Sequence, residues 1–535
     1  MSSLVTAVLL FVIILAVGFS FSRRQGSLLA FVSADGSLPW SLAGLSLFVS
    51  FFSAGTFVAW GGIAYLDGMV AIMIHETICL AGLVCGLLIA PRWKRTGTRT
   101  AAEYLERRYG AQTRNVFTLL FFFLSVLSSA AFLYPVAKLL SVFSGWDLAG
   151  CTIGLGGLCV LYVSVGGLWS VVVTDVIQFF ILTAVVLIAV PLSLQQAGGA
   201  ETLRSALDPS MLRPVSEGFP ALFLFAFFLY NVAYLGGGWS FVQKYGAVRT
   251  SRDVRRSGLL FSVLYGICPF LWMLPAVCWR VIGGAADPAQ AEGAFLSMCK
   301  LCLPDGLMGI MLSALVFSSM SSMNAQLNAM ASVFARDLSS RPDKLRTARR
   351  TGIVLGVVII ALALLIPRSG GLVNYIVSLS ALVGAPLYMP VVWSLFSGRQ
   401  TGRSLCWVVL LSLAVNLVLK LGLYPSLDNA RTVEMTVGVG APLVLLLLFE
   451  FQARLSGRPE VPMPESKPSD NRSAGEANRY GLRVLAWGIM AMGALFVVVS
   501  FRDARGRVLT FLSGVVLLVA ASVVLAASRK PSNLL

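Results

Sequence analysis

The sequence predicts an all-α polytopic membrane protein. Of its 535 residues, 57% are hydrophobic and only 12% are charged, a composition that soluble globular chains of this length do not have. Nearly every part of the chain contains an apolar run long enough to cross a bilayer as a helix. The short alternating strands of a membrane β-barrel are not evident.

The chain has a formal charge of +17, and the positions of its basic residues favour a lipid bilayer over nucleic acid as the partner. Its basic residues cluster in short loops between apolar runs, and roughly 30 of the 41 Lys and Arg fall on one side of the predicted topology. By the positive-inside rule that side is cytoplasmic. We therefore expect a multi-pass protein of the cell (inner) membrane, with the N-terminus outside and the C-terminus in the cytoplasm.

Apolar runs predict about fifteen spans. In order they cover 4–21, 38–66, 69–90, 115–140, 148–168, 171–193, 219–239, 258–281, 306–328, 351–367, 372–396, 405–423, 434–451, 483–500 and 508–527. The segment 456–478 is rich in Pro, Ser, Glu and Asn, which predicts a disordered cytoplasmic linker. The sequence contains no phosphate-binding G-x-x-x-x-G-K-[ST] loop and no soluble segment large enough for an ATPase or kinase.

Hydroxyl groups line one face of the ninth predicted span. Ser318, Ser321 and Ser322 are spaced i, i+3, i+4 and therefore share one side of a helix. Such a face either joins two helices by hydrogen bonds or supplies half of an oxygen site for a small hard cation.

Two predicted spans carry residues that disfavour a continuous helix. The second contains Ser53 and Thr56 among small residues, and the seventh ends in the run Gly236–Gly238. Close helix packing, or a simple helix end, would also explain glycines here. The two interruptions lie five spans apart, which is typical of transporters built from inverted five-helix repeats that bind substrate and ion at broken helices.

Isolated polar residues within spans are further candidates. Asp175 opens the sixth span, either as a functional carboxylate or as one favoured by a helix N-terminus. His75 and Glu76 in the third span would form a proton relay, lie in a wet vestibule or pair with each other. Because His75 is the only histidine, we expect no transition-metal site. Cys299 and Cys302 would form either an external disulfide or an idle pair.

Four motifs in order resemble the sodium:solute symporters, a family that includes bacterial proline, pantothenate, sialic acid and sugar transporters. The resemblance covers about residues 4–451. Its motifs are Thr100–Gly110 (TAAEYLERRYG), Gly166–Gln178 (GGLWSVVVTDVIQ), Gly237–Ser251 (GGWSFVQKYGAVRTS) and Leu303–Leu338. It implies a leucine-transporter-type core with one extra N-terminal helix and extra C-terminal helices.

The resulting division has six parts. They are 1–37 (the extra helix and loop), 38–193 (first inverted repeat), 194–396 (second inverted repeat), 397–455 (spans twelve and thirteen), 456–478 (linker) and 479–535 (two additional spans).

Residue by residue, the resemblance implies a sodium site. The carbonyl groups of Val49, Phe52 and Ser318 and the hydroxyls of Ser321 and Ser322 would bind Na⁺, the coupling ion. Asp175 matches an aspartate on the family's cation pathway.

The resemblance also implies a solute site. Tyr234 falls at an aromatic inner gate, and Asn231 matches a polar site residue. Together with Ser53, Thr56 and Glu76 they form the predicted solute-binding set.

Two departures from the family pattern separate this chain from its best-known substrates. Gly55 and Thr56 stand where sugar-transporting members carry Glu-Gln, and Phe51 replaces the proline-type aspartate. The prediction is a sodium-coupled symporter of a small organic solute, and not an enzyme. The alternatives are a sensory protein of the same fold and a proton-coupled or uncoupled solute transporter.

Overall fold

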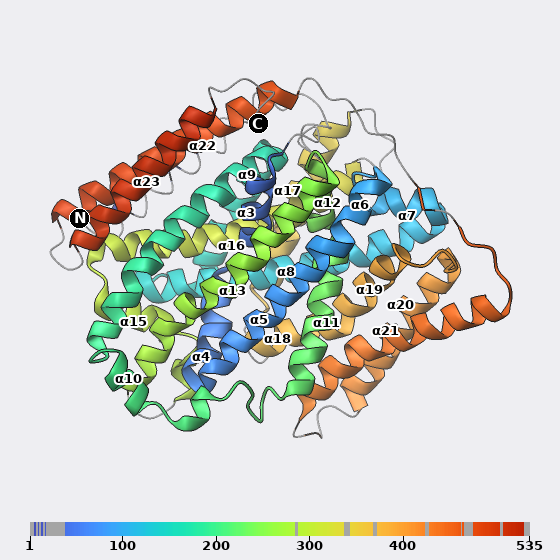
Figure 1. The fold of residues 1–535 in the computed structure, drawn as a ribbon, viewed down its shortest axis with the longest axis horizontal. Coiled ribbons are helices and arrows are strands. Elements are labelled where there is room, and N and C mark those ends of the chain that lie inside the picture. Colours follow the sequence, from blue (N-terminus) through green and yellow to red (C-terminus); the bar gives the residue numbers. More distant parts are fainter. Residues whose placement is uncertain are drawn as a thin grey trace.

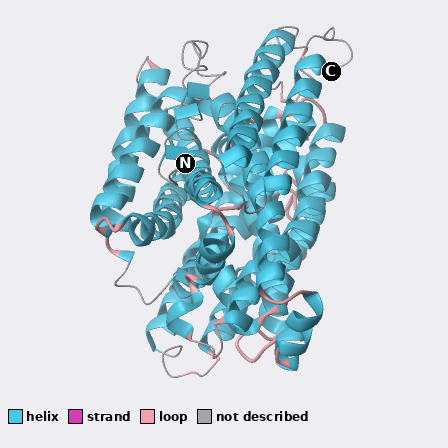
Figure 2. Ribbon diagram, turned by 90° about the vertical axis from the view of Figure 1, so that its left-hand side faces the viewer, coloured by secondary structure: helices cyan, strands magenta, loops and turns pink. Residues whose placement is uncertain are grey.

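The protein is described here from a computed structural model. The described residues are 38–283, 287–335, 343–366, 372–422, 429–461, 474–502 and 507–528, with residues 5–6, 9, 12–13, 16–17, 427 and 463–464. Over these residues the regular elements are helices, which Figure 2 shows in cyan. Two isolated β-bridges, Leu38 with Val248 and Ser216 with Phe219, are also present. The predicted all-α class is confirmed for this part of the chain. The expected first span, 4–21, lies largely outside it.

Nine helices among the described residues are long and apolar enough to cross a membrane, and two bent pairs raise the number to eleven. The predicted number of about fifteen is therefore not confirmed. The nine lie in α5 (Met69–Val84) with η3 (Cys85–Ile89) and α6 (Ala90–Thr96), α8 (Ala111–Ser144), α9 (Leu148–Gln196), α13 (Ser251–Ile282), α18 (Leu372–Leu379) with η7 (Ser380–Gly384) and α19 (Ala385–Ser394), α20 (Gly402–Gly422), α21 (Ala430–Leu455), α22 (Ala474–Arg502) and α23 (Arg507–Ala527).

Further helices complete the chain order. Two are long, α16 (Asp305–Val333) and α17 (Lys344–Ala363), and they coincide with the ninth and tenth predicted spans. The short ones are α7 (Ala101–Tyr109), α10 (Ala200–Ala206), η4 (Pro209–Leu212), α14 (Pro288–Ala291) and α15 (Ala294–Cys302). Cys299 and Cys302 in α15 are buried free thiols.

The second predicted span is broken where its hydroxyl residues gather. Helix α3 (Trp40–Phe51) ends at Phe52, whose ψ of 139° is extended, and the chain resumes as η2 (Thr56–Trp60) and α4 (Gly61–Asp67) with a bend of 58°. The Thr56 hydroxyl accepts the Ser53 N–H at 3.3 Å, and the Ser53 hydroxyl accepts the Gly55 N–H at 3.2 Å. These side chains offer the backbone a local alternative to helical bonding.

The seventh predicted span is broken at its glycine run. Helix α11 (Ala221–Gly237) and helix α12 (Trp239–Ala247) meet at Gly238 with a bend of 52°. A Cβ atom on Gly237 would lie 2.8 Å from the Tyr388 carbonyl oxygen, and one on Gly236 would lie 2.9 Å from Ile89 Cδ1. The run therefore serves both explanations left open by the sequence, since it ends a helix and lets α11 pack closely on α19 and η3.

Helix α9 covers the range of two predicted spans, 148–168 and 171–193. Its backbone is helical from Leu148 to Gln196, and its apolar segments are Leu148–Val160 and Val171–Gln196. The second of these carries Asp175 into the protein interior.

The broken helices occupy the middle of the bundle. Helix α3 packs against α9, α13 and α16, while α11 packs against α5, α19 and α21. Next to the first break, the Phe52 ring lies 4.3 Å from the Trp272 ring between centroids. Helices α22 and α23 pack on each other along one edge of the molecule (Figure 1). Both also pack against α9.

Candidate functional site

The unwound segment after α3 faces the serine-rich part of α16. The Ser322 hydroxyl donates to the Phe52 carbonyl oxygen at 2.8 Å and lies 3.3 Å from the Ser318 carbonyl oxygen. Beside it, the Ser319 hydroxyl accepts the Ala54 N–H at 2.8 Å. The structure thus brings together Phe52, Ser318 and Ser322, which are three of the residues expected to bind sodium. All three are buried.

A small cavity of about 10 Å³ adjoins these residues and is lined in part by Val49, Phe52, Ser318 and Gln178. Gln178 is 4% exposed, and its Oε1 atom has no hydrogen-bond partner among the described residues. The donors here are carbonyl, amide and hydroxyl oxygens, the ligand type that hard cations prefer. The Ser322 hydroxyl is able to turn its lone pairs toward an ion, so the chemistry of the set fits sodium.

Ser321 belongs to α16, but its side chain lies outside the described part of the chain. Its expected hydroxyl ligand therefore stays a prediction.

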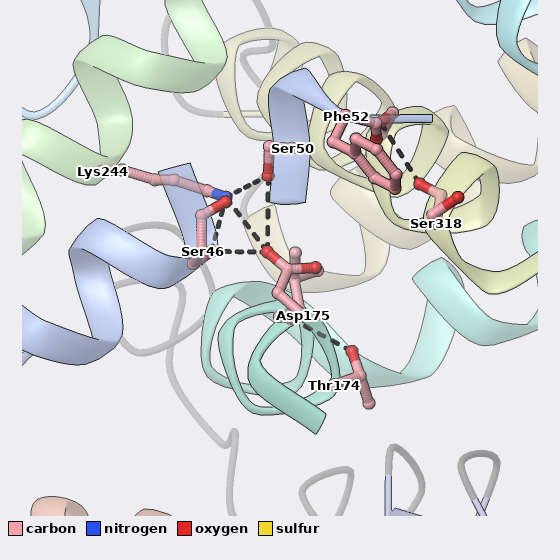
Figure 3. A network of polar contacts seen from close by, with 9 residues as sticks. Ser46, Ser50, Phe52, Thr174, Asp175, Lys244 and Ser318 are labelled. Carbon is pink, nitrogen blue, oxygen red and sulfur yellow. Dashed lines mark hydrogen bonds and ion pairs between the residues drawn. The ribbon is translucent and has the colours of Figure 1, made fainter. Parts of the chain in front are cut away.

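A buried ion pair lies beside this region, as Figure 3 shows. The Lys244 ammonium nitrogen lies 3.2 Å from Asp175 Oδ2, and the two side chains are 1% and 0% exposed. Lys244 also donates to the carbonyl oxygen of Ser46 at 2.9 Å, to its hydroxyl at 2.6 Å and to the Ser50 hydroxyl. The Ser46 and Ser50 hydroxyls in turn donate to Asp175 Oδ2, at 2.5 and 3.3 Å.

Lys244 was not among the predicted site residues, because the sequence places it in a basic stretch ahead of Arg249, Arg252 and Arg255. One signal distinguishes it from that stretch. Lys244 follows the glycine run by about a turn and a half of helix, with Val242 two positions before it and Tyr245 directly after it. A helix continuing from Gly238 through these apolar residues would bury it.

A second cavity, of about 110 Å³, lies between the two breaks. Ser53, Thr56, Asn231 and Tyr234 line it, which brings together four of the five residues expected to bind the solute. Its other lining groups are mainly aromatic and aliphatic, with the hydroxyls of Ser128 and Ser380, and none of the described lining residues carries a charge. The Asn231 amide nitrogen donates to the Phe227 carbonyl at 2.8 Å, while its Oδ1 atom is buried with no partner among the described residues.

Aromatic rings close this cavity toward α12. The Tyr234 ring lies 5.4 Å from the Phe51 ring and 5.2 Å from the Phe241 ring, between centroids. These ring contacts join Tyr234 of α11 to α3 and to α12 at one side of the cavity.

Glu76 is the member of the predicted solute-binding set that the structure does not bring to the cavity. It is half-buried, and its Oε1 atom has no partner among the described residues. His75 is buried beside it, with Nδ1 2.7 Å from the Ala71 carbonyl oxygen and its ring against Trp60, Tyr265 and Trp272. None of these four contacts links His75 to Glu76.

Three comparisons with known proteins bear on this geometry. A sequence model of the sodium:solute symporter family matches residues 31–411. The mouse (Mus musculus) solute carrier family 5 member 4B is 24% identical over 77% of this chain and 71% of its own length. The sodium/glucose cotransporter of Vibrio parahaemolyticus is 25% identical over 76% of this chain and 83% of its own length.

Among solved structures, a substrate-bound, outward-open Na⁺-coupled sialic acid symporter is similar, with a TM-score of 0.72 and 20% identity. The similarity covers 86% of this chain and 99% of that one. At this identity it establishes a shared fold.

Proposed function

The chain belongs to the sodium:solute symporter family, and on this premise we propose that it imports a small organic solute together with sodium by alternating access. In this proposal Val49, Phe52, Ser318, Ser321 and Ser322 hold the ion. The solute occupies the cavity that Ser53, Thr56, Asn231 and Tyr234 line. Spans 2–6 and 7–11 form the two inverted repeats, with the N-terminus outside the cell.

One observation carries the proposal, namely the hydrogen bond from the Ser322 hydroxyl to the Phe52 carbonyl. It joins the break in α3 to the serine face of α16, so an ion placed there would bind two helices at once. An ion that prefers one arrangement of α3 and α16 shifts the population toward that arrangement. Because Ser53 follows Phe52 directly and Thr56 lies four positions after it, the same arrangement would also set the solute cavity.

The cavity lining points to a solute without net charge. A buried charge with no partner is strongly disfavoured, and the described lining supplies hydroxyl, amide and aromatic groups. The unpartnered Asn231 Oδ1 atom calls for a hydrogen-bond donor on the solute.

Thermal unfolding of the purified chain tests the sodium assignment without knowledge of the solute. Sodium, compared with choline, should raise the apparent Tm of the wild type, because an ion bound to the folded state stabilises it. Ser322→Ala should abolish most of this rise. The matched control Ser262→Ala removes a buried hydroxyl that bonds within its own helix, to the Gly258 carbonyl, and should keep the rise.

A rise that Ser322→Ala leaves unchanged would contradict the site. A Tm that follows pH and ignores sodium would instead favour proton coupling through Glu76 or Asp175. A screen of neutral solutes, each with sodium and with choline, then identifies the cargo as the compound that stabilises only with sodium.

A further inference from the structure

We propose that the Lys244 ammonium group is a tethered cation that fills the place at Asp175 where a second coupling ion would otherwise bind. The chain then binds one sodium ion per transport cycle. This inference rests on the proposed function and adds the number of ions to it.

The first argument is the shell of oxygens around the ammonium nitrogen. Four oxygens surround it, namely the Ser46 carbonyl at 2.9 Å, the Ser46 hydroxyl at 2.6 Å, Asp175 Oδ2 at 3.2 Å and the Ser50 hydroxyl. Carbonyl, hydroxyl and carboxylate oxygens are also the ligands of a bound hard cation. Figure 3 shows the nitrogen pointing into this group from α12, while the oxygens come from α3 and α9.

The second argument is burial. Asp175 is fully buried, and a buried carboxylate charge is strongly disfavoured unless a positive partner and hydrogen bonds compensate for its lost hydration. Lys244 supplies the positive charge from a helix that the protein has bent toward α3. The pair is therefore complete without an ion from solution.

The third argument is position relative to the proposed sodium site. Ser46 and Ser50 lie one turn apart on α3, and Val49 lies between them in sequence. On α9, Gln178 is one turn beyond Asp175 and lines the small cavity with Val49, Phe52 and Ser318. The tethered cation is thus a neighbour of the proposed ion and shares two helices with it.

Electrostatic repulsion prevents the Lys244 ammonium group and a sodium ion from lying beside Asp175 at the same time. A sodium ion at Asp175 would stand next to the ammonium group. Like charges about 4 Å apart, at an effective dielectric constant of about 20, repel enough to weaken binding roughly a thousandfold. Sodium therefore binds at Val49, Phe52 and the α16 serines, and Asp175 stays with Lys244.

Counting bound sodium tests the inference. Radioactive sodium at saturation on the purified full-length chain should give one ion per wild-type molecule. Lys244→Met, which keeps the length but removes the charge, should give two, with a steeper rise of Tm against sodium concentration. Lys244→Arg and the double variant Lys244→Met with Asp175→Asn should each return to one.

The outcomes separate this inference from the proposed function. Two ions on the wild type would overturn the inference and leave the symporter proposal standing, as would one ion on a folded Lys244→Met chain. No sodium on the wild type would overturn both. If Lys244→Met alone fails to fold, the count on the wild type still tests the inference, because a second ion on the wild type would overturn it.

Discussion

At the scale of single residues, two neighbouring serines of α16 hold the first break in different ways. Ser322 donates to the Phe52 carbonyl, whereas Ser319 accepts the Ala54 N–H. The first bond is replaceable by an ion, because a carbonyl accepts from a proton or binds a cation with the same lone pair. The second is not, because an N–H group cannot bind a cation. Ser319 is thus the structural member of the pair.

Ser319→Ala should therefore destabilise the chain with or without sodium. It leaves the buried Ala54 N–H without an acceptor, which costs about 1–3 kcal/mol. The apparent Tm should fall by a similar amount in sodium and in choline. Ser500→Ala is the matched control, because Ser500 is equally buried and its hydroxyl bonds within its own helix to Val497. A Tm loss seen only in sodium would instead make Ser319 part of the ion site.

At the scale of helices, the backbones of α13 and η3 approach each other closely. A Cβ on Gly258 would lie 2.3 Å from the Gly86 Cα, so the two backbones touch at a pair of glycines. Small residues allow such contact between membrane helices, where packing rather than the hydrophobic effect drives association. Because α13 also packs against α3, this contact fixes the position of the first broken helix.

Gly258→Ala should push α13 away from η3. Overpacking of this kind costs about 1–3 kcal/mol, and we expect a lower Tm in thermal unfolding. Gly266→Ala provides the control on the same helix, since its Cβ would meet only Cys79 Sγ at 3.4 Å. It should leave the Tm unchanged or raise it through better helix propensity. Equal losses for both variants would refute the role given to the glycine pair.

The two breaks were predictable because their cause is local. Ser53 and Thr56 bond to backbone groups within three residues, and the glycines of α11 have low helix propensity wherever they stand. The serine face of α16 followed from helical spacing alone. These short-range signals were enough to predict that the first break would face the serine-rich part of α16, where the structure places it.

The pairing of Lys244 with Asp175 was not predictable in the same way. The two residues are 69 positions apart, and each has an ordinary local explanation, as a loop lysine and as a helix-terminal carboxylate. Glu76 illustrates the reverse case. Its place within a span suggested a role, but its side chain does not reach the cavity, because helix rotation depends on packing that single-sequence patterns do not contain.

At the scale of the whole molecule, one end of the bundle is fastened by basic side chains. Arg108 of α7 donates to the carbonyl oxygens of Ser394, Ser397 and Val461, and Lys94 donates to that of Gly246 at 3.0 Å. The start of the predicted linker is held to the same end of the bundle. Its Val461 N–H donates to the Gly398 carbonyl, and its Glu460 pairs with Arg399. Helix α8 begins there and runs 34 residues, about 50 Å, to the loop that carries Trp146.

Cysteine labelling in intact cells should place these ends on opposite sides of the membrane. Trp146→Cys, at a side chain that is 68% exposed, should react with an impermeant maleimide added outside. Arg458→Cys should react only after permeabilisation, because the basic end is cytoplasmic in the proposed orientation. The unmodified chain gives the background from its native cysteines. The reverse pattern would invert the topology.

The half-helices α3 and α12 are joined to each other by hydrogen bonds. Leu38, just before α3, donates its N–H to the Ala247 carbonyl at the end of α12 at 3.0 Å, and Lys244 of α12 donates to the Ser46 carbonyl of α3 at 2.9 Å. Helix α3 ends at the proposed ion ligands, and α12 begins under the solute cavity. A movement of this joined pair would therefore affect both proposed sites. In the proposed transport cycle the two half-helices would therefore move together, and such coupling would resist slippage, in which the ion gradient runs down with no cargo moved.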